Sequence, residues 1–218
     1  MSPDQLLNEF GNALLETAWM MSIAVLAAII IGVPLGIALF VTSEGMFYEN
    51  RLLQQIAGTI VNIIRSIPFI ILLVVLIPLT KLILGTSMGP TAASVSLTAA
   101  AIPFYARLVE TSLREVDRGV VEAAESCGAS PWLIIKDVLL PEAKPGMVAG
   151  LTVTIISLLS YSAMAGIVGG GGIGDLAIRF GYYRFQNDVM LITVIVLIIL
   201  VQLIQFIGDR IAKAVNKK

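Results

Sequence analysis

Five long apolar runs limit the folds open to this chain. The first covers residues 17–43 without a charged side chain, and the second lies between Arg51 and Lys81, interrupted only by Arg65. The others cover residues 82–106, 145–174 and 189–208. A helix needs about 20 apolar residues to cross a hydrocarbon core of roughly 30 Å. None of the runs alternates as strands do, and lipid admits only helices or closed barrels.

The runs therefore predict an all-α membrane protein with five transmembrane helices, in a single transmembrane domain over residues 1–218. We expect the spans at about residues 14–41, 54–80, 86–108, 146–170 and 187–208. The N-terminus carries Asp4 and Glu9 and no basic residue, which is unlike a cleaved signal peptide. The first run is therefore expected to remain as a span.

The composition argues against most other classes of protein. Only 13% of the residues are charged, against about 25% in soluble proteins. A net charge of −1 gives no basic surface for nucleic acid. The lone Cys127 excludes an internal disulfide, and the absence of histidine removes the usual general base and the commonest metal ligand. We expect no catalytic residue and no metal site in this chain.

The distribution of Lys and Arg predicts the orientation in the membrane. One set of loops holds ten basic residues and the opposite set holds three, and the more basic loops face the cytoplasm. The N-terminus should therefore lie outside and the C-terminus inside. The ten are Arg51, Arg107, Arg114, Arg118, Lys136, Lys144, Arg210, Lys213, Lys217 and Lys218, and the three are Lys81, Arg179 and Arg184.

A polar segment separates the third and fourth spans. Residues 107–144 hold 12 of the 29 charged side chains. Residues 119–127 predict a short helix that ends at Gly128, because glycine adopts a left-handed backbone without steric cost. Ser130 and Pro131 then read as an N-cap followed by proline in the first turn. We expect a second helix from Pro131 to about residue 139, stopped by Pro141 and Pro145.

The first of these short helices has a face suited to another protein. Ala123 and Ala124 permit close approach, and Glu122 offers a charge to an Arg or Lys. The alternative is an ordinary solvated loop. The order of helix, glycine, Ser-Pro and helix favours a docking segment, at about residues 117–144.

Glu122-Ala123-Ala124, Gly128 and Leu140-Pro141 resemble the EAA signature of membrane permeases in ATP-binding-cassette importers. Val138 stands where that pattern usually has Ile. Further stretches resemble the methionine-uptake permease subgroup, namely NIIRSIPFIILL (62–73), LLPEAKPG (139–146), YSAMAGIVGGGGIG (161–174) and QFIGDR (205–210).

The resemblance implies a permease for L- or D-methionine or related small amino acids. It implies a multi-pass protein of the bacterial cytoplasmic (inner) membrane that works as a homodimer, with two cytoplasmic ATPase subunits and an external substrate-binding lipoprotein. ATP and Mg would sit on the ATPase, and this chain would bind no cofactor. The coupling helix that docks in the ATPase cleft would be built from Glu122, Ala123, Ala124, Gly128, Ser130, Pro131, Leu140 and Pro141.

Arg65 is a candidate for the translocation pathway. Residues 66–80 give only about 22 Å of helix, so the second span must include Arg65 inside the hydrocarbon or at its cytoplasmic edge. A charge there indicates function by default, such as binding a substrate carboxylate. The alternatives are snorkelling to the interface or a hydrogen bond to carbonyls freed by Pro68. Ser66 and Pro68 join Arg65 as candidates.

The fourth span carries a second set of pathway candidates, Ser160, Tyr161, Ser162 and Met164. Serine in such a helix also serves ordinary helix packing. Tyr161 and Met164 are three residues apart and should share a face. The resemblance implies a gate near Met164, whose polarisable thioether suits an apolar side chain such as that of methionine.

Two other classes of function remain open. A secondary transporter or channel for small amino acids, without an ATPase, should show buried acids or interrupted repeats, and Glu16 alone lies near a span end. A membrane enzyme or assembly factor is opposed by the lack of histidine and of paired acids. For an importer, energy must come from a partner, whose closure on ATP would switch the pore from inward-open to outward-open.

Overall fold

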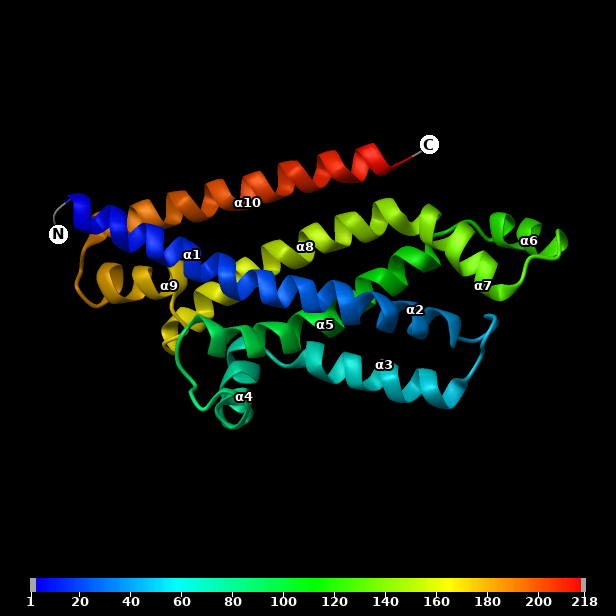
Figure 1. The fold of residues 1–218 in the computed structure, drawn as a ribbon, viewed down its shortest axis with the longest axis horizontal. Helices are drawn as coiled ribbons and strands as arrows, with labels where there is room; N and C mark the ends of the chain where they lie inside the picture. The colour runs from blue at the N-terminus through cyan, green and yellow to red at the C-terminus, as the bar shows by residue number, and fades with distance from the viewer. Residues whose placement is uncertain (1–2, 217–218) are drawn as a thin grey trace.

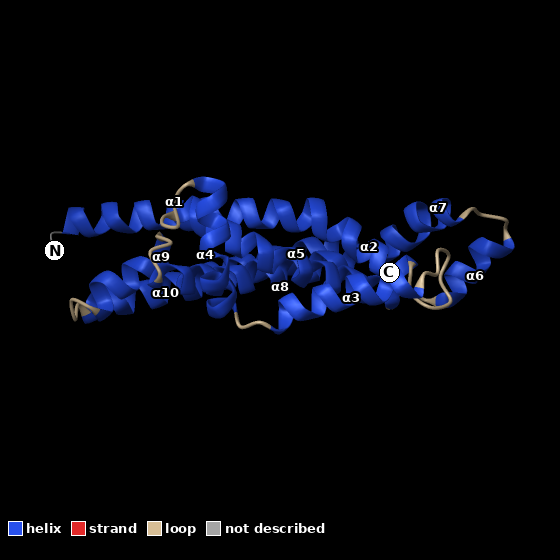
Figure 2. Ribbon diagram, turned by 90° about the horizontal axis from the view of Figure 1, so that it is seen from below, coloured by secondary structure: helices blue, strands red, loops and turns tan. Residues whose placement is uncertain are grey.

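A computed structural model describes residues 3–216, with side chains from residue 5 onward, and this part of the chain is helical without a strand (Figures 1 and 2). Lys217 and Lys218, which belong to the charge count, lie outside it. The elements in order are α1 (Pro3–Ala27), η1 (Ala28–Gly32), α2 (Val33–Val41), α3 (Arg51–Ser66), α4 (Phe69–Leu84), α5 (Pro90–Arg114), α6 (Arg118–Ser126), α7 (Pro131–Leu133), η2 (Ile134–Leu139), α8 (Leu140–Ile167), α9 (Gly172–Leu176), η3 (Ala177–Tyr182) and α10 (Asn187–Val215), where η marks a π-helical stretch.

Four helical stretches in the described chain are long and apolar enough to cross a membrane. They are Gln5–Val41, Pro90–Arg114, Pro131–Ile167 and Asn187–Val215. The pair α3 and α4 makes a fifth span only when its two halves are taken together, because they meet at an angle of 108°. The predicted all-helical membrane protein is confirmed at this level, with four or five spans.

The span expected at about residues 54–80 is not one straight helix. α3 ends at Ser66, Ile67 is extended with φ −79° and ψ 124°, and α4 starts after Pro68. Proline lacks an N–H and disfavours helical backbone in the residue before it. The chain therefore turns at Pro68, and α4 is seen nearly end-on in Figure 1.

The helix that follows the polar corner is also different from the expectation. Residues from Pro131 to Ile167 form one continuous helix, so Pro141 and Pro145 do not stop it. The π-helical stretch η2 ends at Leu139, two residues before Pro141, so the proline lies where the helix changes from π to α turns. Ile134, Ile135 and Leu139 of this stretch are buried in the core.

α5 lies at the centre of the helix packing, against α1, α2, α4 and α8. The approach of α2 is close because Gly36 has no side chain. A Cβ atom there would lie 2.5 Å from the Ala106 carbonyl oxygen and 2.7 Å from Val109 Cβ. The hydrophobic effect does not drive helices together inside a bilayer. Small residues at such crossings let the helices approach closely enough for van der Waals packing to hold them.

The two ends of the molecule differ. The N-terminus and α9 lie at one end, and α6 and α7 lie at the other, toward which the C-terminus also points (Figures 1 and 2). At the first end α1 caps α9. The backbone N–H of Gly172 donates to Glu16 Oε2 at 2.7 Å, and that of Ile173 donates to Thr17 Oγ1 at 3.0 Å.

Candidate functional site

The polar segment folds into the first short helix and the tight corner that its sequence predicts, whereas the second helix continues into α8. Asp117 is the N-cap of α6, and its side chain accepts from the Gly119 N–H at 2.7 Å. The helix ends at Ser126, and Gly128, directly after the C-cap Cys127, has φ +77°. The Gly128 N–H donates to the Glu125 backbone carbonyl at 2.8 Å, and the Ala129 N–H donates to the Ala124 backbone carbonyl at 3.1 Å. These two bonds form a Schellman motif and confirm Gly128 as the residue that stops the helix.

The next helix starts as predicted. Ser130 is its N-cap, with Oγ accepting from the Leu133 N–H at 3.4 Å, and Pro131 occupies the first turn. One turn later, Ile134 and Ile135 are buried. The corner is thus anchored to the core through η2.

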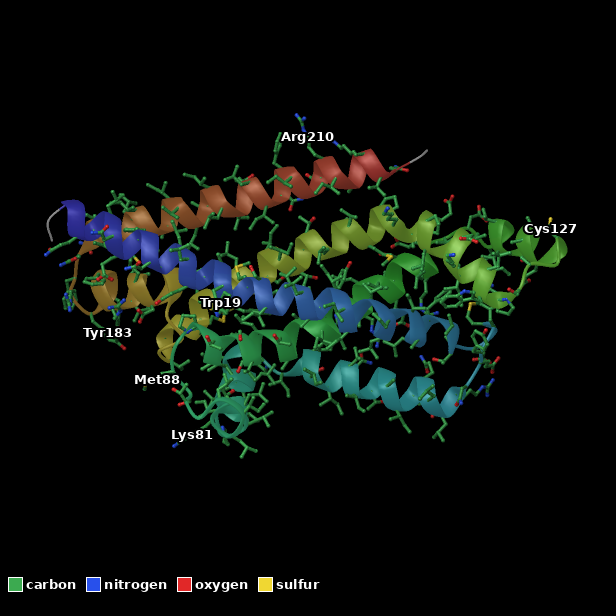
Figure 3. The ribbon with its side chains drawn as sticks, viewed as in Figure 1. Trp19, Lys81, Met88, Cys127, Tyr183 and Arg210 are labelled. Carbon is green, nitrogen blue, oxygen red and sulfur yellow. The ribbon has the colours of Figure 1, made fainter. Side chains whose placement is uncertain are left out.

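An exposed surface covers the far end of α6 and α7. We name it the tip surface. Its residues are all exposed to solvent. Trp132 is 68% exposed and Leu133 46%, although both are large apolar side chains. Exposed apolar side chains gathered in this way mark interaction sites. The tip surface consists of Val120, Glu122, Ala123, Cys127, Trp132 and Leu133; Cys127 stands at the extremity in Figure 3.

Ala124, Leu140 and Pro141 of the EAA-like pattern are not part of the tip surface. Ala124 is half-buried and packs against the core, as does Leu140. Pro141 is exposed and lines a cleft of about 480 Å³ between the end of α5 and the start of α8. Glu122 also lines a cleft, of about 430 Å³, shared with Glu44, Arg114 and Arg118.

Arg65 lies in the last turn of α3, beside the break in the second span. Its guanidinium carbon is 5.9 Å from the centroid of the Phe104 ring on α5. No carboxylate among residues 5–216 lies within ion-pair distance of it. Ser66 Oγ donates to the Asn62 carbonyl at 2.7 Å, and the Pro68 carbonyl accepts from the Leu72 N–H at 3.0 Å. The three candidates thus meet at one break.

The candidates on α8 point to two different neighbours. Tyr161 stacks on Phe69 of α4, with ring centroids 4.5 Å apart and planes 8° from parallel. Ser160 and Met164 instead line an apolar groove of about 430 Å³ against α9, η3 and α10. Ser162 is buried and donates to the Leu159 carbonyl at 2.7 Å. The expected common face of Tyr161 and Met164 is therefore wrong, because the stacking turns Tyr161 toward α4.

Sequence reasoning missed a charged cluster on α5. Glu110 is only 1% exposed and bonds both Arg107 and Arg114. The spacing of these residues, three and four apart on one helix, is a signal that could have found them. Their link to Asn62 of α3, 45 residues earlier, leaves no such trace in the sequence.

The fold defines the class of protein, a multi-pass helical membrane protein with a polar helical segment between two of its candidate spans. Residues 28–218 match the family of binding-protein-dependent transport system inner membrane components. The chain belongs to this family, and it is a transport subunit.

Relatives of this chain include permease proteins of methionine transport systems. The probable D-methionine transport system permease protein MetI of Vibrio cholerae is 51% identical over 93% of this chain and 90% of its own length. The methionine import system permease protein MetP of Bacillus subtilis is 45% identical over 99% and 97%. The predicted resemblance to methionine-uptake permeases is confirmed.

Solved structures of transporters have the same fold as this chain. The inward-facing MetNI methionine ABC transporter matches with a TM-score of 0.95 and 46% identity over the full length of both chains. An amino acid ABC transporter crystallised with histidines has a TM-score of 0.81 at 18% identity, which shows a common fold alone.

Proposed function

We propose that this chain is the permease of an ATP-driven importer for methionine, in its L or D form, or related small amino acids. The observation that carries the proposal is the whole-length likeness to a methionine ABC transporter, at 46% identity and a TM-score of 0.95. Two copies of the chain would pair, each with one cytoplasmic ATPase subunit. An external lipoprotein would deliver the substrate, and the complex would sit in the bacterial inner membrane.

The proposed topology places the end with α6 and α7 in the cytoplasm. α3 starts there with Arg51, α6 starts there with Arg118, and α10 approaches that end with Arg210 (Figure 3). Loops with an excess of basic residues face the cytoplasm. The N-terminus, α9 and Tyr183 would then lie outside, where the lipoprotein arrives.

The tip surface is the proposed docking site for the ATPase. Trp132 and Leu133 would bury their exposed apolar area in the partner, and Glu122 would pair with a basic side chain there. ATP and Mg would be held by the ATPase, so this chain would need no cofactor of its own. Gly128, Ser130 and Pro131 would act by keeping the corner in shape.

The proposed mechanism uses the continuous helix from Pro131 to Ile167 as a lever. At 1.5 Å per residue its 37 residues extend about 55 Å. Closure of two ATPases on ATP would draw the two tips together and displace the far part of α8 as a rigid body. That part holds Ser160, Tyr161, Ser162 and Met164, which we propose to line the pathway together with Arg65, Ser66 and Pro68 at the break.

Reconstitution tests the proposal. The permease, its ATPase and its lipoprotein are placed in liposomes, and uptake of radiolabelled L- and D-methionine is followed with and without ATP. We expect uptake only with ATP and none with an ATPase variant that cannot hydrolyse it. Uptake without the ATPase, driven by an ion gradient, would instead establish a secondary transporter.

A further inference from the structure

Glu110 is a buried carboxylate without a role in the function proposed so far. Its side chain is 2% exposed, in α5, and both of its oxygens are occupied. Oε2 accepts from Arg107 Nη1 at 2.6 Å, and Oε1 accepts from Arg114 Nη2 at 2.8 Å and Nε at 3.2 Å. A carboxylate buried between two arginines gives little net stability compared with apolar side chains of similar size. Its presence here therefore needs a reason other than stability.

The cluster reaches beyond α5 in two directions. Arg107 Nη2 donates to Asn62 Oδ1 on α3 at 2.7 Å. At the other end the Arg114 guanidinium carbon lies 6.0 Å from the centroid of the Phe40 ring on α2. We name Asn62, Arg107, Glu110 and Arg114 the Glu110 network.

The Glu110 network starts beside the docking segment, at about residues 117–144, and ends beside the break at Pro68. Arg114 is the last residue of α5, and α6 begins four residues later at Arg118. Asn62 accepts the Ser66 hydroxyl on its carbonyl, one turn before the chain breaks. The network thus joins the two regions on which the proposed mechanism depends.

The bond to Asn62 matters because α3 has few other attachments. Of its 16 residues only Gly58 and Val61 are buried. A hydrogen bond from a charged guanidinium is about twice as strong as a neutral one. The bond between Arg107 and Asn62 is therefore one of the contacts that hold α3 against α5, beside the burial of Gly58 and Val61.

We propose that the Glu110 network makes α3 and the α5–α6 junction move as one body, so that motion at the tip surface reaches the break at Pro68. This inference rests on the proposed function. Glu110 acts as a positioning residue: it fixes the two arginines, and Arg107 then holds α3. Contacts that join two helices do not by themselves demonstrate energetic coupling between them. Coupling is measured by comparing a double substitution with its two single substitutions.

The test uses the full reconstituted complex and measures ATP hydrolysed per radiolabelled L-methionine imported. Asn62→Leu removes the acceptor, and Arg107→Lys keeps the charge beside Glu110 but loses the fork that reaches Asn62. Each should raise the ratio by about tenfold or more, the effect of one hydrogen bond to a charged group. Gln55→Leu, at an exposed position of α3, is the matched control and should leave the ratio unchanged.

The double variant should raise the ratio no more than the larger single variant, because both remove the same bond. Asn62→Asp, which keeps an acceptor, should remain at the wild-type ratio. If the network had only a structural role, the substitutions would lower the yield of complex, ATP hydrolysis and methionine import together. The ratio of ATP hydrolysed to methionine imported would then stay constant. Should Asn62→Leu prevent assembly, Arg107→Lys decides the question alone.

An unchanged ratio in an assembled Arg107→Lys complex, or additive effects in the double variant, would overturn the inference. Its failure is distinct from that of the proposed function. The latter fails when the wild-type complex shows no ATP-dependent uptake, whereas this inference fails with wild-type uptake intact.

Discussion

The corner at Gly128 and the break at Pro68 both redirect the chain between two helices, but they are held in different ways. The corner is fixed by contacts within 17 residues of sequence, from the Asp117 cap to the Ser130 cap that reaches Leu133. The break is held by distant residues, through the stacking of Phe69 on Tyr161 and the packing of Arg65 near Phe104.

The difference suggests different roles. A corner held by hydrogen bonds between residues close in sequence keeps its shape when the rest of the protein moves, which suits a surface on which a partner pulls. A break held by α5 and α8 must change when those helices shift. In our account the tip surface transmits force as a rigid handle, and the break is where the pathway responds.

Replacing Gly128 gives the largest effect expected from this comparison. Gly128→Val places a β-branched residue at φ +77°, which costs more than the about 1–2 kcal/mol of an ordinary side chain. The corner should refold, and ATP-dependent uptake should fall by about tenfold or more. Gly128→Asn is the control, since asparagine tolerates this backbone. Wild-type uptake by Gly128→Val, at equal amounts in the membrane, would show that the corner does not act as a handle.

Reversing the charge of Glu122 tests the handle without changing its shape. Glu122→Lys should lower uptake by about fivefold to tenfold while insertion is unchanged, because a like charge would then face the basic partner side chain. Glu122→Gln, which loses the charge alone, should have a smaller effect. Uptake is compared with ATPase activity in the same liposomes. An equal response to both variants would rule out a charge contact.

Substitution of Arg65 tests the break. If Arg65 binds the substrate carboxylate, Arg65→Gln should raise the KM for uptake by about threefold to tenfold, and Arg65→Lys should raise it less. Arg51→Gln, an exposed arginine at the start of the same helix, is the matched control. Unchanged uptake by Arg65→Gln would leave Arg65 with a structural role at the break.

The smallest effect is expected for the aromatic pair. Phe69→Leu and Tyr161→Leu should each lower the Tm in detergent by a few degrees. The double variant should show a coupling of about 0.5–1.5 kcal/mol, the value of one aromatic pair. Leu72→Ala, on the same buried face of α4, provides a control that should combine additively with Tyr161→Leu. Additive effects of Phe69→Leu and Tyr161→Leu would show that the stack does not hold the break.

The same contrast explains what could be predicted from the sequence. Gly128, Ser130 and Pro131 act on neighbouring backbone groups, so the corner was predictable. The effect of a proline depends on the turns around it. Pro68 breaks a span, whereas Pro141, two residues after the end of the π-helical stretch η2, does not.

Contacts across the fold could not be predicted. Sequence periodicity indicates that α8 is a helix, but it does not say that Tyr161 faces α4 while Met164 faces α9 and α10. The bond between Arg107 and Asn62 joins helices whose packing angle the sequence does not set. In a bundle driven by close packing of small residues, such angles arise from the whole set of neighbours.

The central claim, that the tip surface docks the ATPase, has a direct test in Cys127. It is the one cysteine of the chain and lies exposed at the end of α6 (Figure 3). We would measure the rate at which a maleimide modifies it in the isolated permease and in the complex with the ATPase. Docking predicts fast modification of the permease alone and a rate about tenfold or more slower in the complex, because burial excludes the reagent. Equal rates in the two samples would contradict the account.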